Sequence, residues 1–208
     1  MNTFKRNLFL LVVVGLIAAG CQMAIPVEVN QNKLIRTTPP TGMQLTMLSQ
    51  AKDARSGYGR DQVGRHTWSV FMIPGFTVSS DEPLEVAIAR RTRESLKSIG
   101  YDVLTVDKIQ EAQGPVVVIQ IDTLRNLLFS WLYPLGVTWG HMRLSVHLMS
   151  PEGDDLWQAH LKGDSGMGAS LLYMSGFKTR VRNDLTTNVN QIVEILSSRE
   201  FNHLNIAR

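Results

Sequence analysis

Apolar residues recur along this chain with two different periods, and the periods separate predicted helices from predicted strands. The clearest helical pattern lies between residues 177 and 198, where apolar positions fall three or four apart and share one helix face. This stripe consists of Phe177, Val181, Leu185, Val189, Ile192, Val193 and Leu196. We therefore predict a long carboxy-terminal helix that buries the stripe.

A second helix is predicted from Pro83 to Gly100. Ser79 and Glu82 have the spacing of a capping box, and Pro83 falls in the first turn. Apolar residues then recur at helical spacing, and Gly100 follows the last of them. Glycine just after a helix adopts a positive φ at low cost, so we expect the helix to stop there.

Shorter apolar runs predict strands at 44–48, 68–71, 101–106 and 115–124, with a short helix over 107–113. The run at 115–124 is almost continuously apolar, which is typical of a strand in the middle of a sheet. A turn at 151–154 predicts a hairpin in which Leu144 faces Leu161, Val146 faces Ala159 and Leu148 faces Trp157.

This order of elements predicts an α+β fold, a mostly antiparallel sheet with two helices packed on one face. We expect one such domain over residues 43–208. Residues 22–42 are rich in Pro, Asn and Thr and show little periodicity, so residues 21–42 are predicted to form a tether.

Residues 1–20 have the pattern of a signal peptide. Lys5 and Arg6 precede about ten apolar residues, fewer than the ~20 that a membrane-spanning helix needs. Small residues then lead to Cys21, the single cysteine of the chain. An ordinary secretory signal and a short membrane anchor are the alternatives.

The residues before Cys21 look like the lipobox of bacterial lipoproteins. The resemblance implies cleavage before Cys21, lipidation of its thiol and acylation of the new amino terminus. In the sorting rule of these proteins, Asp after the cysteine retains the protein in the inner membrane. Gln22 stands there, which implies an outer-membrane lipoprotein with its domain in the periplasm.

Charge gives little indication of a polyanionic partner. The chain has 21 Lys and Arg against 18 Asp and Glu, and loss of Lys5 and Arg6 with the signal peptide leaves 19 against 18. Nucleic-acid binding needs clustered bases, so we do not expect it. The bases of the first helix alternate with Glu85 and Glu94, which is typical of a solvated face rather than of a lipid-binding one.

The residues with reactive side chains do not form a known catalytic or metal-binding motif. Five histidines show no His-x-x-x-His spacing, and His147 and His160 fall on the polar face of the predicted hairpin. Ser165 lacks the Gly-x-Ser-x-Gly elbow, and Gln62 interrupts a Gly-x-Gly-x-x-Gly pattern. We therefore predict no catalytic residue, no metal and no cofactor.

One segment is apolar and aromatic where a connecting loop is expected. It lies at 127–136, and its candidate contact residues are Phe129, Trp131, Leu132 and Tyr133. Exposed aromatic side chains commonly mark a membrane interface or a protein-binding surface. The alternative is that the segment folds back and caps the open side of the sheet.

The chain also resembles the YajG-like group of envelope lipoproteins. The resemblance rests on the lipobox, the tether, Asp53-x-Arg55, a helix ending in Gly100-Tyr101, the hairpin and the last helix. It implies a non-enzymatic accessory or structural role in binding an envelope protein or further copies of the chain. An enzyme acting on an envelope polymer or lipid, and a lipid- or ligand-carrying module, are the alternatives.

Overall fold

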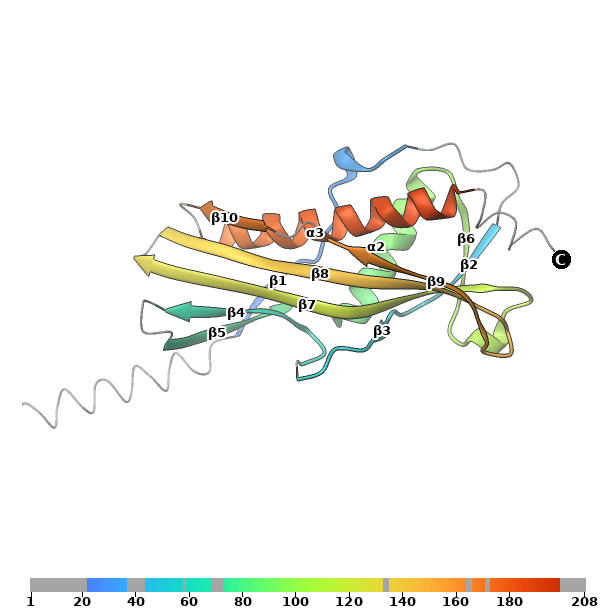
Figure 1. The fold of residues 1–208 in the computed structure, drawn as a ribbon, viewed down its shortest axis with the longest axis horizontal. Coiled ribbons are helices and arrows are strands. Elements are labelled where there is room, and N and C mark those ends of the chain that lie inside the picture. The colour runs from blue at the N-terminus through green and yellow to red at the C-terminus, as the bar shows by residue number, and fades with distance from the viewer. Residues whose placement is uncertain are drawn as a thin grey trace, which may run out of the picture.

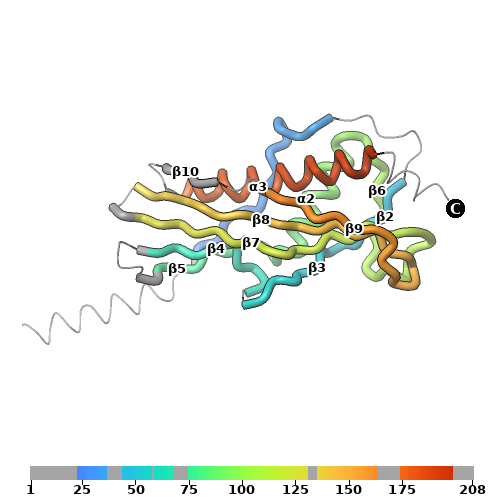
Figure 2. The backbone as a smooth tube through the Cα atoms, in the orientation of Figure 1, coloured from blue at the N-terminus to red at the C-terminus, as the bar shows by residue number. Residues whose placement is uncertain are grey.

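A computed structural model describes residues 22–36, 44–57, 59–68, 73–132, 135–163, 166–170 and 173–198. Figure 1 shows long strands covered by two helices, and Figure 2 traces the same backbone. The helices are α2 (Leu84–Ser98) and α3 (Tyr173–Leu196), with short 3-10 turns at Gln31–Lys33 and Ile109–Glu111. The strands are β1 (Gln22–Ile25), β2 (Gln44–Leu48), β3 (Lys52–Asp53), β4 (Gln62–Trp68), β5 (Ile73–Ser80), β6 (Asp102–Val106), β7 (Val116–Leu132), β8 (Leu135–Met149), β9 (Asp155–Lys162) and β10 (Gly166–Ser170).

The α+β class is as predicted, but the sheet is mixed rather than mostly antiparallel. β7 pairs in parallel with β2, β3 and β4, and antiparallel with β8. The β1–β5 and β2–β6 pairs are also parallel, whereas β4–β5, β8–β9 and β8–β10 are antiparallel. Parallel pairs join segments that are far apart in sequence and have no tight turn between them, so no local turn pattern predicts the pairing.

The predicted central strand and the predicted hairpin are both confirmed. β7 lies between β8 and the β2, β3 and β4 strands, as its apolar run indicated. Leu144 pairs with Leu161, Val146 with Ala159 and Leu148 with Trp157. A register shift near the turn then sets Met149, rather than Ser150, against Asp155.

The structure corrects the elements predicted before α2. Residues 62–68 and 73–80 form the β4–β5 ribbon, where only a short strand at 68–71 was expected. β4 was not predicted because Gly64 was interpreted as part of a loop. In the structure a Cβ at this position would stand 2.5 Å from the carbonyl oxygen of Asn126 and 2.6 Å from the ring of Phe177. The close approach of these neighbours, and not a turn, therefore requires glycine.

The two long predicted helices are both present, and they contact each other. The short helix predicted over 107–113 is reduced to the 3-10 turn Ile109–Glu111. Every member of the predicted stripe on α3 is buried, and Gly100 has φ 104°, as expected after the end of α2. The predicted capping box is wrong: Ser79 lies in β5, and Pro83 is the N-cap residue without a side-chain hydrogen bond.

The structure also corrects the first part of the predicted tether. Gln22–Ile25 is the strand β1, and Ile25, Val27 and Val29 belong to the buried core. The Ile35 backbone N–H donates to Asn190 on α3 at 3.0 Å. Residues 37–43 lie outside the described part of the chain, so the tether prediction is revised only for residues 22–36.

Candidate functional site

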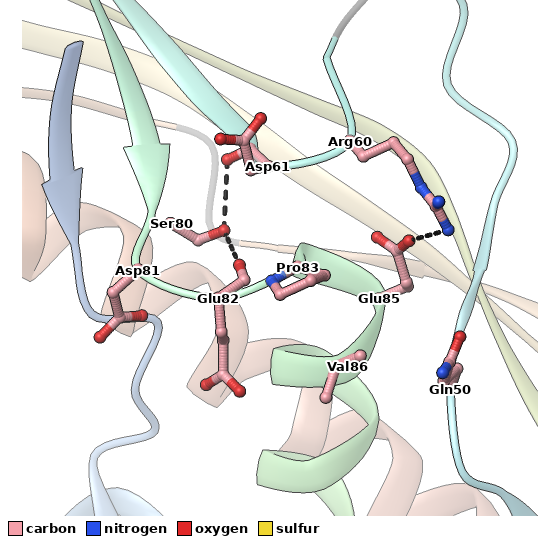
Figure 3. Close-up of a pocket in the computed structure, with 9 residues that line it drawn as sticks. All are labelled: Gln50, Arg60, Asp61, Ser80, Asp81, Glu82, Pro83, Glu85 and Val86. Carbon is pink, nitrogen blue, oxygen red and sulfur yellow. Dashed lines mark hydrogen bonds and ion pairs between the residues drawn. The ribbon is translucent and has the colours of Figure 1, made fainter.

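A hollow of about 560 Å³ lies at the amino end of α2 (Figure 3). Glu85 is 3% exposed and pairs with Arg60, a residue whose side chain is 81% exposed, at 2.5 Å. The Ser80 hydroxyl donates to the carbonyl oxygens of Asp61, at 3.2 Å, and Glu82. These bonds join the end of the β4–β5 ribbon to the start of α2, so the polar groups around the hollow stabilise the fold.

The Asp53-x-Arg55 motif is also engaged within the fold. The Arg55 guanidinium donates to both carboxylate oxygens of Asp53 at 2.8 Å and to the Gln62 carbonyl oxygen at 2.6 Å. Burial acts to raise the pKa of Asp53, but the hydrogen bonds and charge of Arg55 outweigh it and lower that pKa. The motif therefore fixes the turn between β3 and β4.

A serine, an acid and a histidine meet on the face of β7, β8 and β9 that points away from α3. The Ser145 hydroxyl donates to Asp122 Oδ2, and it lies 2.8 Å from His160 Nδ1. In a hydrolytic triad the imidazole stands between the hydroxyl and the carboxylate. Here the hydroxyl stands between the other two and is fully buried, so this arrangement is a cross-strand hydrogen-bond network.

Further along the same face is a basic hollow of about 460 Å³, and Arg125, His141 and Arg143 contribute to its wall. Arg125 and Arg143 are exposed. Burial is the largest cause of the lowered pKa of His141, followed by the charges of Arg143, Arg125 and Arg180. With Arg65, an exposed residue of the neighbouring β4, these side chains form what we call the basic band: Arg65, Arg125, His141 and Arg143.

Beyond the basic band, the same face becomes apolar. The rings of Phe129 and Trp139 have centroids 6.2 Å apart at an angle of 45°, and Leu135 is 49% exposed. Together with two further residues these side chains form what we call the apolar patch: Leu127, Phe129, Leu135, Val137 and Trp139. All of its members except Leu135 are half-buried.

The structure changes the interpretation of the predicted contact segment. Residues 127–132 are not a loop, because they continue β7 and pair with β8 as far as Leu132 opposite Leu135. Phe129 belongs to the apolar patch. The side chains of Trp131 and Leu132, and the whole of Tyr133, lie outside the described part of the chain, so their contact role stays a prediction.

Cys21 also lies outside the described residues, but the residue after it is placed. Gln22 begins one of the rows that cross the sheet: it pairs with Thr77, Thr77 with Arg65, Arg65 with Leu127, and Leu127 with Trp139. Four strand spacings of about 4.8 Å place Gln22 and Trp139 about 19 Å apart in one row. The amino end of β1 and the apolar patch are thus at the same end of the sheet.

The basic band was not predicted from the sequence. Its members come from β4, β7 and β8, and Arg125 lies opposite His141 only because β7 and β8 pair over their whole length. The residues from Leu124 to Leu128 do not alternate between apolar and polar types, because Asn126 is buried and Leu127 is half-buried. The interpretation of residues 127–136 as a loop also concealed the length of β7.

No protein family model matches this chain, and no curated protein matches it. The resemblance to the YajG-like group therefore stays a prediction. Among the residues that the structure describes, no helix is long and apolar enough to cross a membrane.

Solved structures do match the fold. One is a Xanthomonas campestris protein described as DUF330, at TM-score 0.55 and 11% identity, covering 88% of this chain and 99% of that one. Another is a Helicobacter pylori protein described as a homolog of a neuraminyllactose-binding hemagglutinin, at TM-score 0.53 and 11% identity, covering 86% of this chain and 97% of that one. At this identity the likeness establishes a shared fold.

Proposed function

We propose that this chain is a non-enzymatic binding module of the bacterial cell envelope, anchored by lipid on Cys21. The lipobox-like residues before Cys21 support the anchor, and Gln22 supports the outer membrane as its location with the domain in the periplasm. Two or more acyl chains hold a protein stably at a bilayer, whereas a single chain does not.

The observation that carries this proposal is the position of β1. Gln22 directly follows Cys21, and it is already paired with Thr77 of β5. A lipid on Cys21 would hold the folded domain against the membrane with no flexible linker between them. Such a short attachment suits a module that works at the surface of the bilayer.

The polar clusters favour binding over catalysis. Arg55 and Asp53 fix a turn, Ser145 joins three strands, and Glu85 pairs with Arg60 beside α2. Each of these groups has a structural partner, which accounts for its presence without a reaction. The basic band and the apolar patch are two neighbouring surfaces of the described residues with distinct chemistry, and both are accessible to a binding partner.

The anchor is tested by fatty-acid labelling of cells that produce the full chain. The wild-type protein should take up radioactive fatty acid and sediment with the outer membrane. Cys21→Ser should take up no label and keep its signal peptide, because the thiol is both the acylation site and the residue at the cleavage position. A wild-type protein without label would refute the lipid anchor.

The binding role is tested by chemical crosslinking of the same cells, followed by purification of the anchored protein. We expect an envelope protein or a second copy of this chain among the crosslinked species. Recovery of the monomer alone at crosslinking levels that capture known envelope complexes would contradict a protein-binding module.

A further inference from the structure

The position of the lipid anchor relative to the sheet determines which surface faces the bilayer. Consecutive Cα atoms are 3.8 Å apart, so Cys21 Cα lies that close to Gln22 Cα. Gln22 lies in the same row as Arg65, Leu127 and Trp139. A lipidated Cys21 therefore brings the bilayer to the end of the sheet that contains this row.

The β7–β8 hairpin extends beyond that row. β1 and β5 run toward their carboxyl ends in the direction opposite to β7, so the chain before Gln22 leaves the sheet at the end where β7 finishes. From Leu127 to Leu132 the hairpin continues for five residues, about 17 Å of strand. The hairpin end is consequently the part of the described fold that reaches farthest toward an anchored bilayer.

The side chains on this end change in the order that a membrane interface requires. Leu135 lies nearest the tip, followed by the ladder pair Phe129 and Val137. The row of Leu127 and Trp139 comes next, and Arg125 and Arg143 lie farthest from the tip. Apolar and aromatic groups thus precede Arg125 and Arg143, and Arg65 is level with the last apolar row. Proteins that bury an apolar face about 5–10 Å deep beneath charged head groups have a similar order.

We infer that the end of the β7–β8 hairpin docks on the bilayer that holds Cys21, with the apolar patch in the interface and the basic band at anionic phospholipid head groups. This inference rests on the proposed lipid anchor. Asp122 is the acid in the wall of the basic hollow, and Arg55, Arg125 and Arg143 line the same wall, so bases outnumber acids there. The anchor keeps the domain at the bilayer, and docking of the hairpin end would also fix the orientation of the domain.

The test uses the full-length lipidated protein in vesicles containing phosphatidylglycerol. A fluorescent thiol label is placed at Leu135→Cys, and the matched control is Leu156→Cys. Leu156 is also an exposed strand leucine, at 42% against 49% for Leu135, but it lies beside the β8–β9 turn. About 14 residues of β8 separate the two levels, or about 45 Å.

We expect nitroxide-bearing lipids to quench the Leu135→Cys label and aqueous iodide to quench the Leu156→Cys label. Equal lipid quenching at both positions would overturn the inference.

Thiol labelling of the parent chain, which carries no added cysteine, separates the docking inference from the proposed lipid anchor. If the parent chain takes up the thiol label, Cys21 is free and the anchor fails, and the docking inference falls with it. If Cys21 is blocked and Leu135→Cys is not quenched by lipid, the docking inference alone fails.

The contact of the basic band with lipid head groups is tested with two double variants. The first combines Arg125→Gln and Arg143→Gln. The control combines Arg93→Gln and Lys97→Gln on α2, and it removes the same amount of charge from another surface. A base near an anionic membrane is worth about fivefold in binding, so the first pair should shift the docking equilibrium about 25-fold toward release. Equal lipid quenching of the Leu135→Cys label in the two backgrounds would overturn the role of the basic band.

Discussion

The backbone N–H of Asn30 donates a hydrogen bond to Oγ1 of Thr186 at 2.9 Å, across 156 positions of the sequence. Thr186 is 3% exposed on α3, and its own hydroxyl donates to the Arg182 carbonyl oxygen at 2.6 Å. This bond connects the segment after β1 to the last helix. The residues that follow the predicted lipid site are thereby part of the folded unit.

Thr186→Val should therefore destabilise the protein by about 1 kcal/mol or more. Valine keeps the shape of threonine but leaves the Asn30 N–H without its acceptor. Urea unfolding monitored by circular dichroism measures the change. Thr187→Val, at the neighbouring half-buried position, is the control and should alter stability much less. Equal effects of the two substitutions would show that the bond contributes nothing specific.

Local patterns predicted the elements whose partners are close in sequence. The α3 stripe and the hairpin from Leu144 to Leu161 follow from one periodicity and one turn, and both are present. The mixed sheet could not be predicted in this way. Its parallel pairs bring β2 and β4 beside β7 from positions more than 60 residues away, and no local sequence pattern indicates which strands pair.

The segment after Cys21 shows how a real signal was missed. Ile25, Val27 and Val29 alternate with polar or half-buried positions, which is the period of a half-buried extended segment. Pro26 and the polar residues around Asn30 outweighed that alternation and favoured a tether. The hydrogen bonds that join Asn30 and Ile35 to α3 are long-range, so composition alone could not reveal them.

Gly100→Val should destabilise the protein by about 1 kcal/mol or more. Gly100 has φ 104°, and a β-branched residue is strained in that region. Gly114→Val is the control, because a Cβ at Gly114 meets nothing within 4 Å and its φ is not positive. Thermal melts of the two variants measure the difference. A Gly100→Val protein that melts with the wild type would place the end of α2 elsewhere.

The fold should lose stability as the pH falls from about 6.5 to about 4, and His66 is one cause. His66 is 2% exposed, and burial lowers its pKa from 6.5 to about 4. Its ring stacks on Phe76 with centroids 4.5 Å apart, and Nε2 lies 2.7 Å from the Ser130 hydroxyl. The neutral ring therefore fits the site and the charged ring does not.

The direction of this change in stability follows from proton binding to His66. Between pH 4 and 6.5 the unfolded chain binds a proton at His66 that the folded chain does not, so acid favours unfolding in this window. The contribution is full above pH 6.5 and reaches up to about 3 kcal/mol over the window. Urea unfolding at several pH values measures it, and His66→Gln should flatten the profile between pH 4 and 6.5. An unchanged slope in the variant would assign the pH dependence to other groups.

Trp131 and Tyr133 remain the predicted contact residues at the hairpin end, and the structure alters the balance between contact and capping. β4 reaches only as far as Trp68 opposite Ser130, and β10 ends at Ser170 opposite Gly136, which is itself paired with Ser130. Among the described residues, the β7–β8 hairpin beyond this row has no strand on either side. A segment that extends past its neighbours is better placed to contact a surface than to cap the sheet.

Trp131→Ser with Tyr133→Ser should therefore weaken docking and leave the melting temperature nearly unchanged. Large aromatic side chains at the centre of a contact surface typically contribute about 2 kcal/mol or more to binding. Lipid quenching of a label at Leu135→Cys and thermal unfolding, both measured on the same purified variant, separate the two roles. If the segment caps the core, the double substitution should lower stability by several kcal/mol, as other large-to-small changes in packed sites do. A large loss of stability with lipid quenching intact would therefore contradict the contact role and support capping.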